Sequence, residues 1–400
     1  MTINLPDIYG RMESLMDRAM YDNQLRRQCL NIPVMCEEQL NGIRKGLEAV
    51  PDELLKKIRK VILTGCGDSY FAGIAAVPAF KKYAGAFASS FEAVRCIDAA
   101  RYLEYEKGQE DATLVVAVSA SGSPVRVMEA LRRANQKGCH TLAVTNIPDS
   151  RAAKEAEYSL IVHTPPFPEP GPGLRNYFAS ISALFLLAAR MGAVKGCCDA
   201  GSEAALCRAI SEYTASYEEA FEGMDTLMFD MAKQWKDDIG NEMIGDASMY
   251  STAAFIGAKF VEAAGKMTNA VDSENWCHVN YFRHQPEKSG LLLVADGKDK
   301  NRSRVIETME QASKIGRNCI LITDTDKESY GAPEAVTVCT VPETPEGYEF
   351  LAPLLNYIPG TLLAAYVAAL RGETYFREAG SLQKQSQVGS TIGDSKVEIF

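Results

Sequence analysis

Two segments of the chain combine glycine with hydroxyl side chains in a spacing suited to binding a phosphate group. Residues 65–70 read GCGDSY, and residues 119–124 read SASGSP. Each segment follows a short apolar run that predicts a strand and leads into a pattern that predicts a helix. Backbone N–H groups at a helix N-terminus, together with serine hydroxyls, attract an anion. These residue types therefore predict a site for a small molecule that carries a phosphate.

A simpler interpretation of the second segment needs no ligand. Ser123 would cap the following helix, and Pro124 would occupy its first position. The occurrence of two such turns after successive predicted strands favours the phosphate site over the cap alone.

The second half of the chain lacks an equivalent serine-rich turn. There, the apolar run 291–295 ends in Asp296, Gly297 and Lys298. A carboxylate at this place would repel a phosphate. We therefore expect the first half to bind the phosphate and the second half to contribute other groups.

Short apolar runs alternate with helical patterns along most of the chain. The predicted strands are 60–64, 113–118, 141–145 and 159–163 in a first series and 242–245, 291–295, 319–323 and 335–341 in a second. Strands that alternate with helices indicate parallel sheets covered on both faces. Ligands of such sheets bind beyond the carboxyl ends of the strands, where both serine-containing turns would lie.

The two series of strands indicate a duplicated unit. Residues 126–138 (RVMEALRRANQKG) align without gaps on residues 304–316 (RVIETMEQASKIG). An offset of roughly 180 residues is too long for a solenoid repeat. We predict an α/β fold of two tandem doubly wound parallel-sheet domains with a helical N-terminal segment and a polar C-terminal tail. The predicted bounds are 1–44 for the segment, 45–200 and 215–372 for the domains, and 373–400 for the tail.

The two ends of the chain differ in their patterns. Apolar residues at helical spacing predict helices at 6–20 and 33–49. The tail is polar and contains glycine, serine and glutamine, a composition that suits a disordered terminus.

Composition and charge limit the class of protein. Hydrophobic residues make up 46% and charged residues 24% of the 400 residues, as in an ordinary globular protein. The net charge of −10 argues against binding nucleic acid through a basic face. The longest apolar stretches, 181–189 and 362–370, are shorter than the ~20 residues of a membrane-spanning helix. Because residues 1–10 also lack a signal-peptide pattern, we expect a cytoplasmic protein without a membrane span.

Cysteines and histidines do not form a metal-binding pattern. The eleven cysteines include no C-x-x-C pair, and the four histidines are scattered singly. We expect reduced thiols, no bound metal and no other cofactor.

The GCGDSY turn followed by SASGS, in a duplicated frame, resembles the sugar isomerase (SIS) domain family. The most similar architecture is the isomerase half of glucosamine-6-phosphate synthase, which the fructosamine-6-phosphate deglycases share. The resemblance covers about 20–400 and implies two flavodoxin-like SIS domains. In that family, residues of the two turns hold the sugar phosphate. Carried over, the phosphate-binding residues are Cys66, Gly67, Asp68, Ser69, Ser119, Ala120, Ser121, Gly122 and Ser123. The sequence departs from the family at Asp68, where the synthase has threonine, and at Pro124, where the family has a hydroxyl.

The resemblance also implies the catalytic residues. The synthase carries lysine and glutamate three residues apart on one helix and a histidine sixteen residues later, which Lys259, Glu262 and His278 match. The interval of three places Lys259 and Glu262 on one helix face. In this interpretation Glu262 moves a proton between C1 and C2 of an opened sugar through an enediol, and His278 opens the ring. Lys396 matches the family's active-site lysine near the C-terminus, with Lys384 as a rival in a tail that closes the active site.

Two further features follow from the resemblance. Arg175 lies in residues 169–177 (EPGPGLRNY), where the synthase has a substrate-lining loop, and a guanidinium there could bind a phosphate or carboxylate. An incidental surface arginine is the alternative. The loop with the histidine crosses the subunit boundary in the family, so we expect a homodimer. Trp276, Tyr281 and Phe282 in that loop would be exposed apolar surface without a partner.

Several functions are compatible with these residues. The resemblance implies a phosphosugar isomerase, deglycase or deaminase that acts on a ketose or fructosamine 6-phosphate. Thr2 in place of a cysteine, and only about sixty residues before the first predicted strand, lead us to expect no glutamine-dependent synthesis. The altered surroundings of His278 mildly favour release of an amine, but plain isomerisation ranks equally. The alternative is a non-catalytic phosphosugar-binding regulator, which retention of Glu262 and His278 disfavours.

Overall fold

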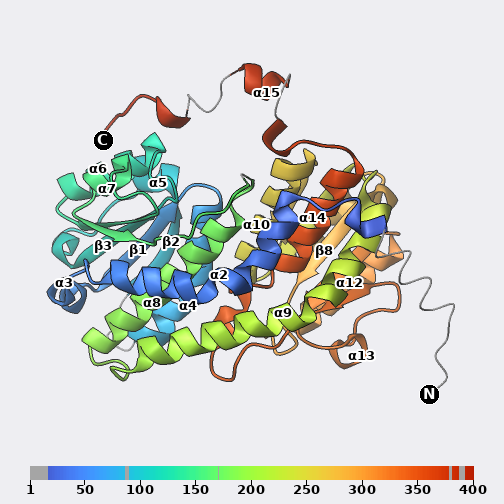
Figure 1. The fold of residues 1–400 in the computed structure, drawn as a ribbon, viewed down its shortest axis with the longest axis horizontal. Helices are drawn as coiled ribbons and strands as arrows, with labels where there is room; N and C mark the ends of the chain where they lie inside the picture. Colours follow the sequence, from blue (N-terminus) through green and yellow to red (C-terminus); the bar gives the residue numbers. More distant parts are fainter. Residues whose placement is uncertain (1–16, 86–89, 170, 378–380, 387–391) are drawn as a thin grey trace.

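Two parallel five-stranded sheets form the frame of the structure, a computed structural model that describes residues 17–85, 90–169, 171–377, 381–386 and 392–400. The first sheet has the order β2-β1-β3-β4-β5 and the second the order β10-β9-β8-β6-β7 (Figure 1). The first contains β1 (Lys60–Gly65), β2 (Ser90–Arg95), β3 (Thr113–Val118), β4 (His140–Thr145) and β5 (Tyr158–Ile161). The second contains β6 (Gly240–Gly245), β7 (Thr268–Val271), β8 (Ser289–Val294), β9 (Asn318–Thr323) and β10 (Thr337–Thr340).

Helices connect the strands and join the two sheets. In the first half they are α2 (Gln24–Leu47), α3 (Asp52–Lys57), α4 (Asp68–Ala84), α5 (Cys96–Arg101), α6 (Val125–Gln136), α7 (Arg151–Glu155) and α8 (Leu174–Val194). In the second half they are α9 (Ser202–Trp235), α10 (Met249–Ala264), α11 (Ser273–His278), α12 (Arg302–Lys314), α13 (Lys327–Tyr330), α14 (Ile358–Leu370) and α15 (Leu382–Gln385). The long helix α9 runs past both halves and packs on α8 of the first and α14 of the second (Figure 1).

The duplication predicted from the sequence is present in the structure. If β6 is matched to β1, the neighbours β7, β8, β9 and β10 take the places of β2, β3, β4 and β5. All strand pairs in both sheets are parallel, so the doubly wound α/β fold is confirmed.

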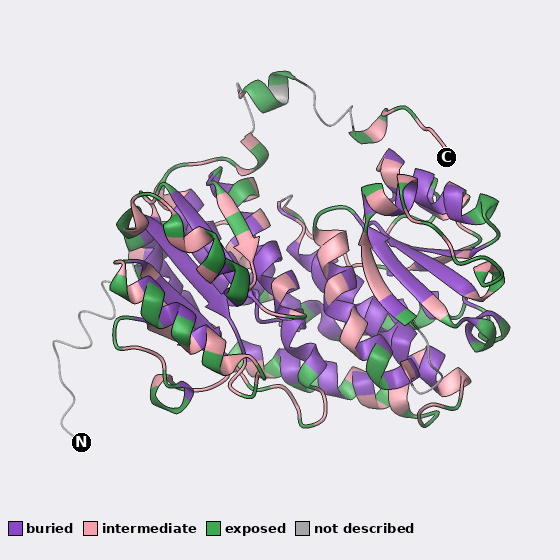
Figure 2. Ribbon diagram, turned by 180° about the vertical axis from the view of Figure 1, so that it is seen from behind, coloured by how far each residue is buried: buried purple, intermediate pink, exposed green. Residues whose placement is uncertain are grey.

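One hydrophobic core extends through both halves. It includes Val61 and Val116 of the first sheet and Met243 and Leu292 of the second, all buried. Helices α4 and α10 pack directly on each other between the sheets. Buried residues accordingly run continuously from one sheet to the other (Figure 2). This packing places the strand ends of the first half beside α10 of the second.

Two strands, β2 and β7, were not predicted from the sequence. β2 and β7 lie at the edges of their sheets. Phe91 is the one buried residue of β2, and β7 has none. An edge strand does not need apolar residues on both faces, so neither segment shows the continuous apolar run that identified the central strands.

The predicted helix at 33–49 begins too late. Helix α2 starts at Gln24, capped by Asn23, whose side chain accepts a hydrogen bond from the N–H of Arg26, and it continues through Pro33. The asparagine cap outweighs the proline as a start signal. Most of the predicted helix at 6–20 lies outside the described residues.

Two helical segments of the described chain are long and apolar enough to span a membrane by length and composition. They are Leu174–Val194 and Glu349–Leu370, whose most apolar windows are 83% and 100% buried inside the molecule. The apolar stretches predicted from the sequence, 181–189 and 362–370, are shorter than these helical segments. Both segments belong to the core, which is where their apolar side chains are packed.

Candidate active site

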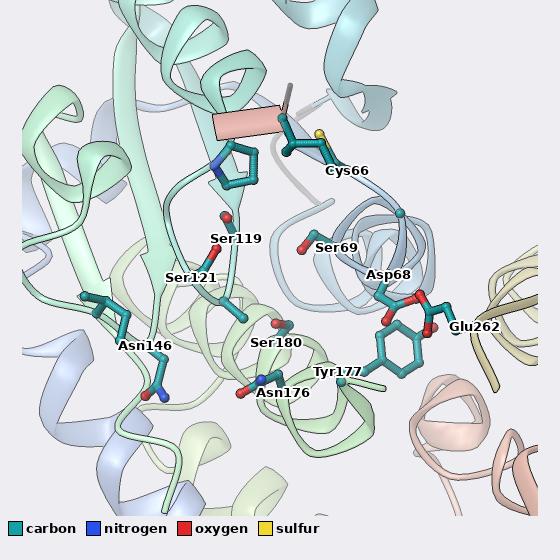
Figure 3. A pocket seen from close by; sticks show the side chains of 16 residues that line it. Cys66, Asp68, Ser69, Ser119, Ser121, Asn146, Asn176, Tyr177, Ser180 and Glu262 are labelled. Atoms are coloured by element: carbon teal, nitrogen blue, oxygen red, sulfur yellow. The ribbon is translucent and has the colours of Figure 1, made fainter. Parts of the chain in front are cut away.

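A cavity of about 610 Å³ lies where the strand ends of the first sheet meet α10 (Figure 3). The loops after β1 and β3 form one side together, because Gly65 and Val118 are register partners at the ends of neighbouring strands. The start of α8 and Glu262 of α10 add further walls. The lining residues are Cys66, Gly67, Asp68, Ser69, Ser119, Ala120, Ser121, Pro124, Asn146, Ile147, Gly173, Asn176, Tyr177, Ser180, Glu262 and Ile392.

Three serine side chains gather at one end of this cavity. Ser69, Ser119 and Ser121 come from the two predicted phosphate turns and lie around one space (Figure 3). Helix α4 begins there at Asp68, with Gly67 as its N-cap and no side chain capping its N–H groups. Hydroxyls and a helix N-terminus suit an anion. The structure thus brings the two turns together as the sequence predicted.

Gly122 and Ser123 do not line the cavity. The N–H of Gly122 donates to the Ser119 hydroxyl at 3.1 Å, and the backbone of Gly122 has φ +59°. A Cβ on Gly122 would lie 2.2 Å from the hydroxyl oxygen of Ser150. Gly122 is therefore needed for the shape of the turn rather than for contact with a ligand.

The predicted helix cap at Ser123 is wrong. The N-cap position of α6 is Pro124, and no side chain caps this helix. The hydroxyls of Ser123 and Ser121 instead lie 2.8 Å apart in a hydrogen bond. The extended backbone of Pro124 moves the helix start one residue later.

The thiol of Cys66 occupies the rim of the cavity. Its neighbour across the register of β1 and β2 is Cys96, because Gly65 and Arg95 pair immediately before them. A hydrogen bond from Cys96 lowers the pKa of the Cys66 thiol, burial opposes this, and the charge of Arg126 lowers it further.

A buried ion triad forms the opposite end of the cavity. The ammonium of Lys259 lies 2.7 Å from a carboxylate oxygen of Asp68 and 2.6 Å from one of Glu262. The Lys259 side chain is fully buried, whereas those of Asp68 and Glu262 are 24% and 30% exposed. Asp68 belongs to α4 and Glu262 to α10, so Lys259 joins the two halves of the molecule. In Figure 3 the carboxyl groups of Asp68 and Glu262 lie side by side next to Tyr177.

The triad adjusts the acidity of Glu262. Burial raises the pKa of its carboxyl group, the nearby charge of Lys259 opposes this, and that of Asp68 adds to it, with a raised pKa as the net result. Burial also pushes the pKa of Lys259 down, but the two carboxylates outweigh burial and raise it. Lys259 therefore stays charged. A carboxyl group with a raised pKa can both accept and return a proton nearer neutral pH.

The other predicted catalytic residues do not line the cavity of their own chain. The side chain of His278 is 68% exposed, and its Nε2 lies 2.8 Å from a carboxylate oxygen of Glu274. Lys396 is exposed and pairs with Glu398. The side chain of Lys384 lies outside the described residues.

A residue other than the two predicted lysines brings the C-terminal tail to the cavity. Ile392 lines the cavity, and beyond it the hydroxyl of Ser395 accepts a hydrogen bond from Arg126 at 2.8 Å. The N–H of Glu398 donates to Glu129 at 2.7 Å. The end of the chain thus lies beside α6 (Figure 1).

Arg175 is neither exposed nor part of the main cavity. It lies in an adjoining hollow, where its guanidinium donates to the carbonyl oxygen of Pro165 at 2.9 Å. The interpretation of an incidental surface arginine is therefore wrong, since only 7% of Arg175 is exposed.

The loop of aromatic residues near His278 is less exposed than predicted. Trp276 is fully buried, because its ring packs in the core of the second sheet and its N–H donates to Glu242 at 2.8 Å. Tyr281 is partly buried against it, and Phe282 remains 77% exposed.

Several residues that line the cavity were not predicted from the sequence. Asn146 directly follows β4, so the strand-end rule that located the serines could have found it. Asn176 and Ser180 are four residues apart on α8 and share one helix face. Tyr177 stacks on Phe255 with ring centroids 3.9 Å apart, a contact between the two halves that no local pattern signals.

The equivalent place in the second half is an acidic hollow. It is lined by Asp296, Asp299, Asp324, Glu343, Glu346 and Glu349 together with Lys298, Lys300 and Thr344. Burial, with the repulsion of Asp324 and Asp299, raises the pKa of Asp296 to about 7. This excess of carboxyl groups agrees with the expectation that the anion site lies in the first half. Among the described residues no group of histidine, cysteine and acidic side chains could hold a metal ion.

Comparisons with known proteins agree with this geometry. Residues 54–190 match the model of the SIS domain. The isomerizing glutamine–fructose-6-phosphate aminotransferases of Zymomonas mobilis and Thermococcus kodakarensis are both 25% identical to this chain, over 379 and 366 residues. These alignments cover 91% and 89% of this chain but 58% and 56% of the relatives. The chain thus spans little more than half the length of the curated relatives it matches.

Solved structures share the fold. The C-terminal domain of glucosamine-fructose-6-phosphate aminotransferase from Francisella tularensis has a TM-score of 0.78 at 18% identity and covers 89% of this chain and 99% of its own. Glucosamine-6-phosphate deaminase from Thermotoga maritima has a TM-score of 0.61 at 17% identity and covers 90% of this chain and 99% of its own. Both likenesses extend over the two sheets and their helices.

Proposed function

We propose that this chain, whose residues 54–190 match the SIS domain, is an enzyme that binds a ketose or ketosamine 6-phosphate and moves a proton between the C1 and C2 carbons of the sugar. The names of the relatives and of the structural neighbours, which include an aminotransferase and a deaminase of sugar phosphates, support this class of substrate.

One observation carries the proposal. A single cavity has phosphate-binding chemistry at one end and a carboxyl group with a raised pKa at the other. Ser69, Ser119 and Ser121 would hold the phosphate, so that the carbonyl end of an open-chain sugar faces Glu262. A buried carboxyl group positioned in this way is suited to general acid–base catalysis.

The reaction needs one group that first takes and then returns a proton. The carboxylate of Glu262 removes the proton from C1 and the carbonyl oxygen at C2 takes up a proton from water, which gives an enediol or, for a ketosamine, an enaminol. Return of the proton from Glu262 to C2, with loss to water of the proton on O1 or on the C1 nitrogen, gives an aldose phosphate or the imine of one. Lys259 stabilises the carboxylate form of Glu262, which is present before the proton is taken and again after it is returned. His278 is proposed to open the sugar ring, from the second subunit of a homodimer.

Replacing Glu262 with glutamine tests the assignment of the base. Glu262→Gln keeps the shape and hydrogen-bonding capacity but removes the proton-transferring group, so kcat should fall by about 10²–10⁴-fold. Affinity for the sugar phosphate should stay within a few-fold, because the serines hold the phosphate. Turnover would be measured after a thermal-shift screen of sugar 6-phosphates and fructosamine 6-phosphates has identified a substrate.

Two further variants complete this experiment. Ser121→Ala should weaken binding of the same ligand, while Glu53→Gln, a matched change at an exposed carboxylate on α3, should alter neither quantity. Normal turnover by Glu262→Gln would overturn the role of Glu262. Unchanged affinity in Ser121→Ala would place the phosphate elsewhere. A ligand that binds without any turnover would favour the alternative of a regulatory sugar-phosphate-binding protein.

A further inference from the structure

Two cysteines follow neighbouring strands at the serine end of the main cavity. Gly65 of β1 and Arg95 of β2 are register partners where both strands end, and Cys66 and Cys96 come directly after them. Neighbouring strands lie about 4.8 Å apart. This separation falls within the range of about 4.4–6.8 Å between the Cα atoms of disulfide-bonded cysteines. The structure holds both residues as free thiols, and a hydrogen bond joins their side chains.

The two thiols differ in their access to solvent. Cys66 is exposed and lines the cavity, where its sulfur lies at the same end as Ser69 and Ser119 (Figure 3). Cys96 is only 4% exposed and belongs to a small apolar cluster with Val127 of α6. A dissolved reagent therefore reaches Cys66 first, while Cys96 is held in the protein interior.

The surroundings give the two thiols different reactivity. The hydrogen bond from Cys96 lowers the pKa of the Cys66 thiol, burial opposes this, and the charge of Arg126 lowers it further. The same hydrogen bond, together with burial, raises the pKa of the Cys96 thiol. The thiolate is the nucleophilic form of cysteine. Cys66 is thus suited to attack an oxidant, and Cys96 is suited to react with the product.

We propose that Cys66 and Cys96 form a peroxide-sensitive pair, and that their oxidation to a disulfide disables the phosphate end of the cavity. This adds a modification site to the proposed function. Formation of the disulfide depends on the two thiols alone, and only its effect on the ligand rests on the proposed function.

The oxidation consists of two balanced steps. The thiolate of Cys66 attacks one oxygen of hydrogen peroxide, the O–O bond breaks and hydroxide leaves, which gives a sulfenic acid at Cys66. The sulfur of Cys96 then attacks the sulfur of Cys66, the S–O bond breaks, and the proton of Cys96 leaves with the hydroxyl group as water. Two thiols lose two electrons in total, and one peroxide accepts them.

The disulfide acts on the turn that is proposed to bind the phosphate. The carbonyl oxygen of Cys66 accepts a hydrogen bond from the N–H of Ser69 at 3.2 Å, so both residues belong to one turn. Cys96 is the first residue of α5 and is fixed by its buried surroundings. A covalent bond draws Cys66 towards Cys96, and the hydrogen-bonded turn must follow. We therefore expect Ser69 to leave its place among the serines.

Peptide mapping by mass spectrometry tests the disulfide without an assay of function. Reduced wild-type protein treated with hydrogen peroxide should yield a peptide pair linked through Cys66 and Cys96, and dithiothreitol should separate the pair again. Cys96→Ala should stop at a sulfenic acid on Cys66, which dimedone traps. Cys197→Ser, a change at a partly exposed thiol after α8, is the matched control and should still give the linked pair.

Calorimetry with fructose 6-phosphate tests the effect on the cavity. Diamide serves as the oxidant here, because it joins two thiols without passing through a sulfenic acid. The oxidised wild-type protein should bind at least about fivefold more weakly than the reduced protein, as expected for the loss of one hydrogen bond to the phosphate. Cys96→Ala should bind like the reduced wild-type protein before and after diamide. Saturating fructose 6-phosphate should also slow the reaction of Cys66 with peroxide.

Three results would overturn the proposal. One is a Cys66 that is oxidised to a sulfinic acid in the wild-type protein without linking to Cys96. Another is a disulfide between other cysteines, or between molecules, while this pair stays reduced. The third is a Cys66–Cys96 disulfide that leaves the affinity for fructose 6-phosphate unchanged. If the reduced protein binds no sugar phosphate at all, the proposed function fails, whereas the mass spectrum still decides whether the disulfide forms.

Discussion

Glu262 shares its ammonium partner with a second carboxylate. Lys259 contacts both Glu262 and Asp68, and these two acidic side chains border the same cavity. A single positive charge therefore balances two negative ones in a partly desolvated place. Asp68 lies at the start of α4, where its negative charge would repel the expected phosphate. The pairing of its carboxylate with Lys259 offsets this repulsion. It also makes the acidity of Glu262 depend on both neighbours.

Removing either neighbour should shift the pH dependence of proton transfer, in opposite directions. Glu262 acts as a base only when deprotonated, so kcat/KM should rise with pH through its pKa. The charge of Asp68 raises that pKa and the charge of Lys259 lowers it. Asp68→Asn should therefore move the acidic limb of the pH profile to lower pH, and Lys259→Met should move it to higher pH. The measurement is kcat/KM from pH 4 to pH 9 for the three proteins.

The stability of the variants provides a control for this experiment. Breaking a buried ion pair by removing one member costs roughly 3–5 kcal/mol, so Lys259→Met should unfold at a lower urea concentration. Asp68→Asn keeps the buried ammonium paired with Glu262 and should be affected less. If the acidic limb moved in the same direction in Asp68→Asn and in Lys259→Met, Glu262 would not be the group that titrates in the pH profile.

The spacing of Lys259 and Glu262 was enough to place them on one face of a helix. The contact with Asp68 could not be predicted, because these residues are 191 positions apart and meet only through the packing of α4 on α10. For the same reason the adjoining hollow around Arg175 was not foreseen. Its walls come mainly from the segment between β5 and α8, with single residues of α2 and of the loop after β4 and two from the start of α8.

The ends of the strands in the first sheet position many of the residues that line the cavity. β1 and β3 were recognisable from sequence because both are buried on both faces, and the residues that follow them line the cavity as expected. The edge strands β2 and β7 were not recognisable, since half-exposed strands lack a continuous apolar run. Positions near the end of a central strand could thus be predicted, while the residues of α8 and of the tail that actually line the cavity, Asn176, Tyr177, Ser180 and Ile392, could not.

The tight passage from strand to helix can be tested with a matched pair of glycines. Gly65 ends β1 and Gly245 ends β6, the equivalent strand of the second half. A Cβ at Gly65 would lie 2.6 Å from the Cβ of Ser69, and one at Gly245 would lie 2.2 Å from the carbonyl oxygen of Met249. Each alanine substitution should lower the free energy of unfolding by about 1–3 kcal/mol, as overpacking does.

Only one of the two substitutions should affect ligand binding. Gly65→Ala displaces Ser69 and should weaken affinity for the sugar phosphate, whereas Gly245→Ala should leave it near the wild-type value. Urea titration gives the stability and calorimetry gives the affinity. Equal loss of affinity in both variants would mean that the serine end of the cavity is not where the phosphate binds.

At the scale of the whole molecule, duplication has produced two unequal halves. The first half offers serines and a helix N-terminus, and the second offers an acidic hollow at the equivalent strand ends. The second half serves the cavity through α10, which supplies Glu262. A site between two halves of one chain can also receive a residue from another subunit. His278 is the candidate for this contribution, because it is exposed and does not line the cavity of its own chain.

We expect His278 to act in the site of a second subunit in a homodimer. It is exposed and does not line the cavity of its own chain, and Phe282 and Val279 nearby are exposed apolar side chains. Glu262→Gln and His278→Asn should each be inactive alone. After mixing and exchange of subunits, one intact site forms in each mixed dimer, and activity should return to roughly a quarter of the wild-type value.

Two results would contradict the shared site. One is a monomer at micromolar concentration in analytical ultracentrifugation. The other is a mixed sample that remains as inactive as its two components although subunit exchange has been verified. His278→Asn with full activity would remove His278 from the reaction altogether.

The central claim is that Glu262 moves a proton at C1 of a sugar phosphate held by the serine end of the cavity. NMR of fructose 6-phosphate, or of the ketosamine 6-phosphate that binds best, incubated with the protein in D₂O tests it most directly, because exchange at C1 reports proton transfer whichever product is finally released. We predict that the wild-type protein replaces one C1 hydrogen with deuterium, and that Glu262→Gln does so at least 100-fold more slowly while it still binds the sugar. Exchange at the wild-type rate in Glu262→Gln would contradict the claim. So would a wild-type protein saturated with the ligand that neither introduces deuterium at C1 nor transfers hydrogen from C1 to C2.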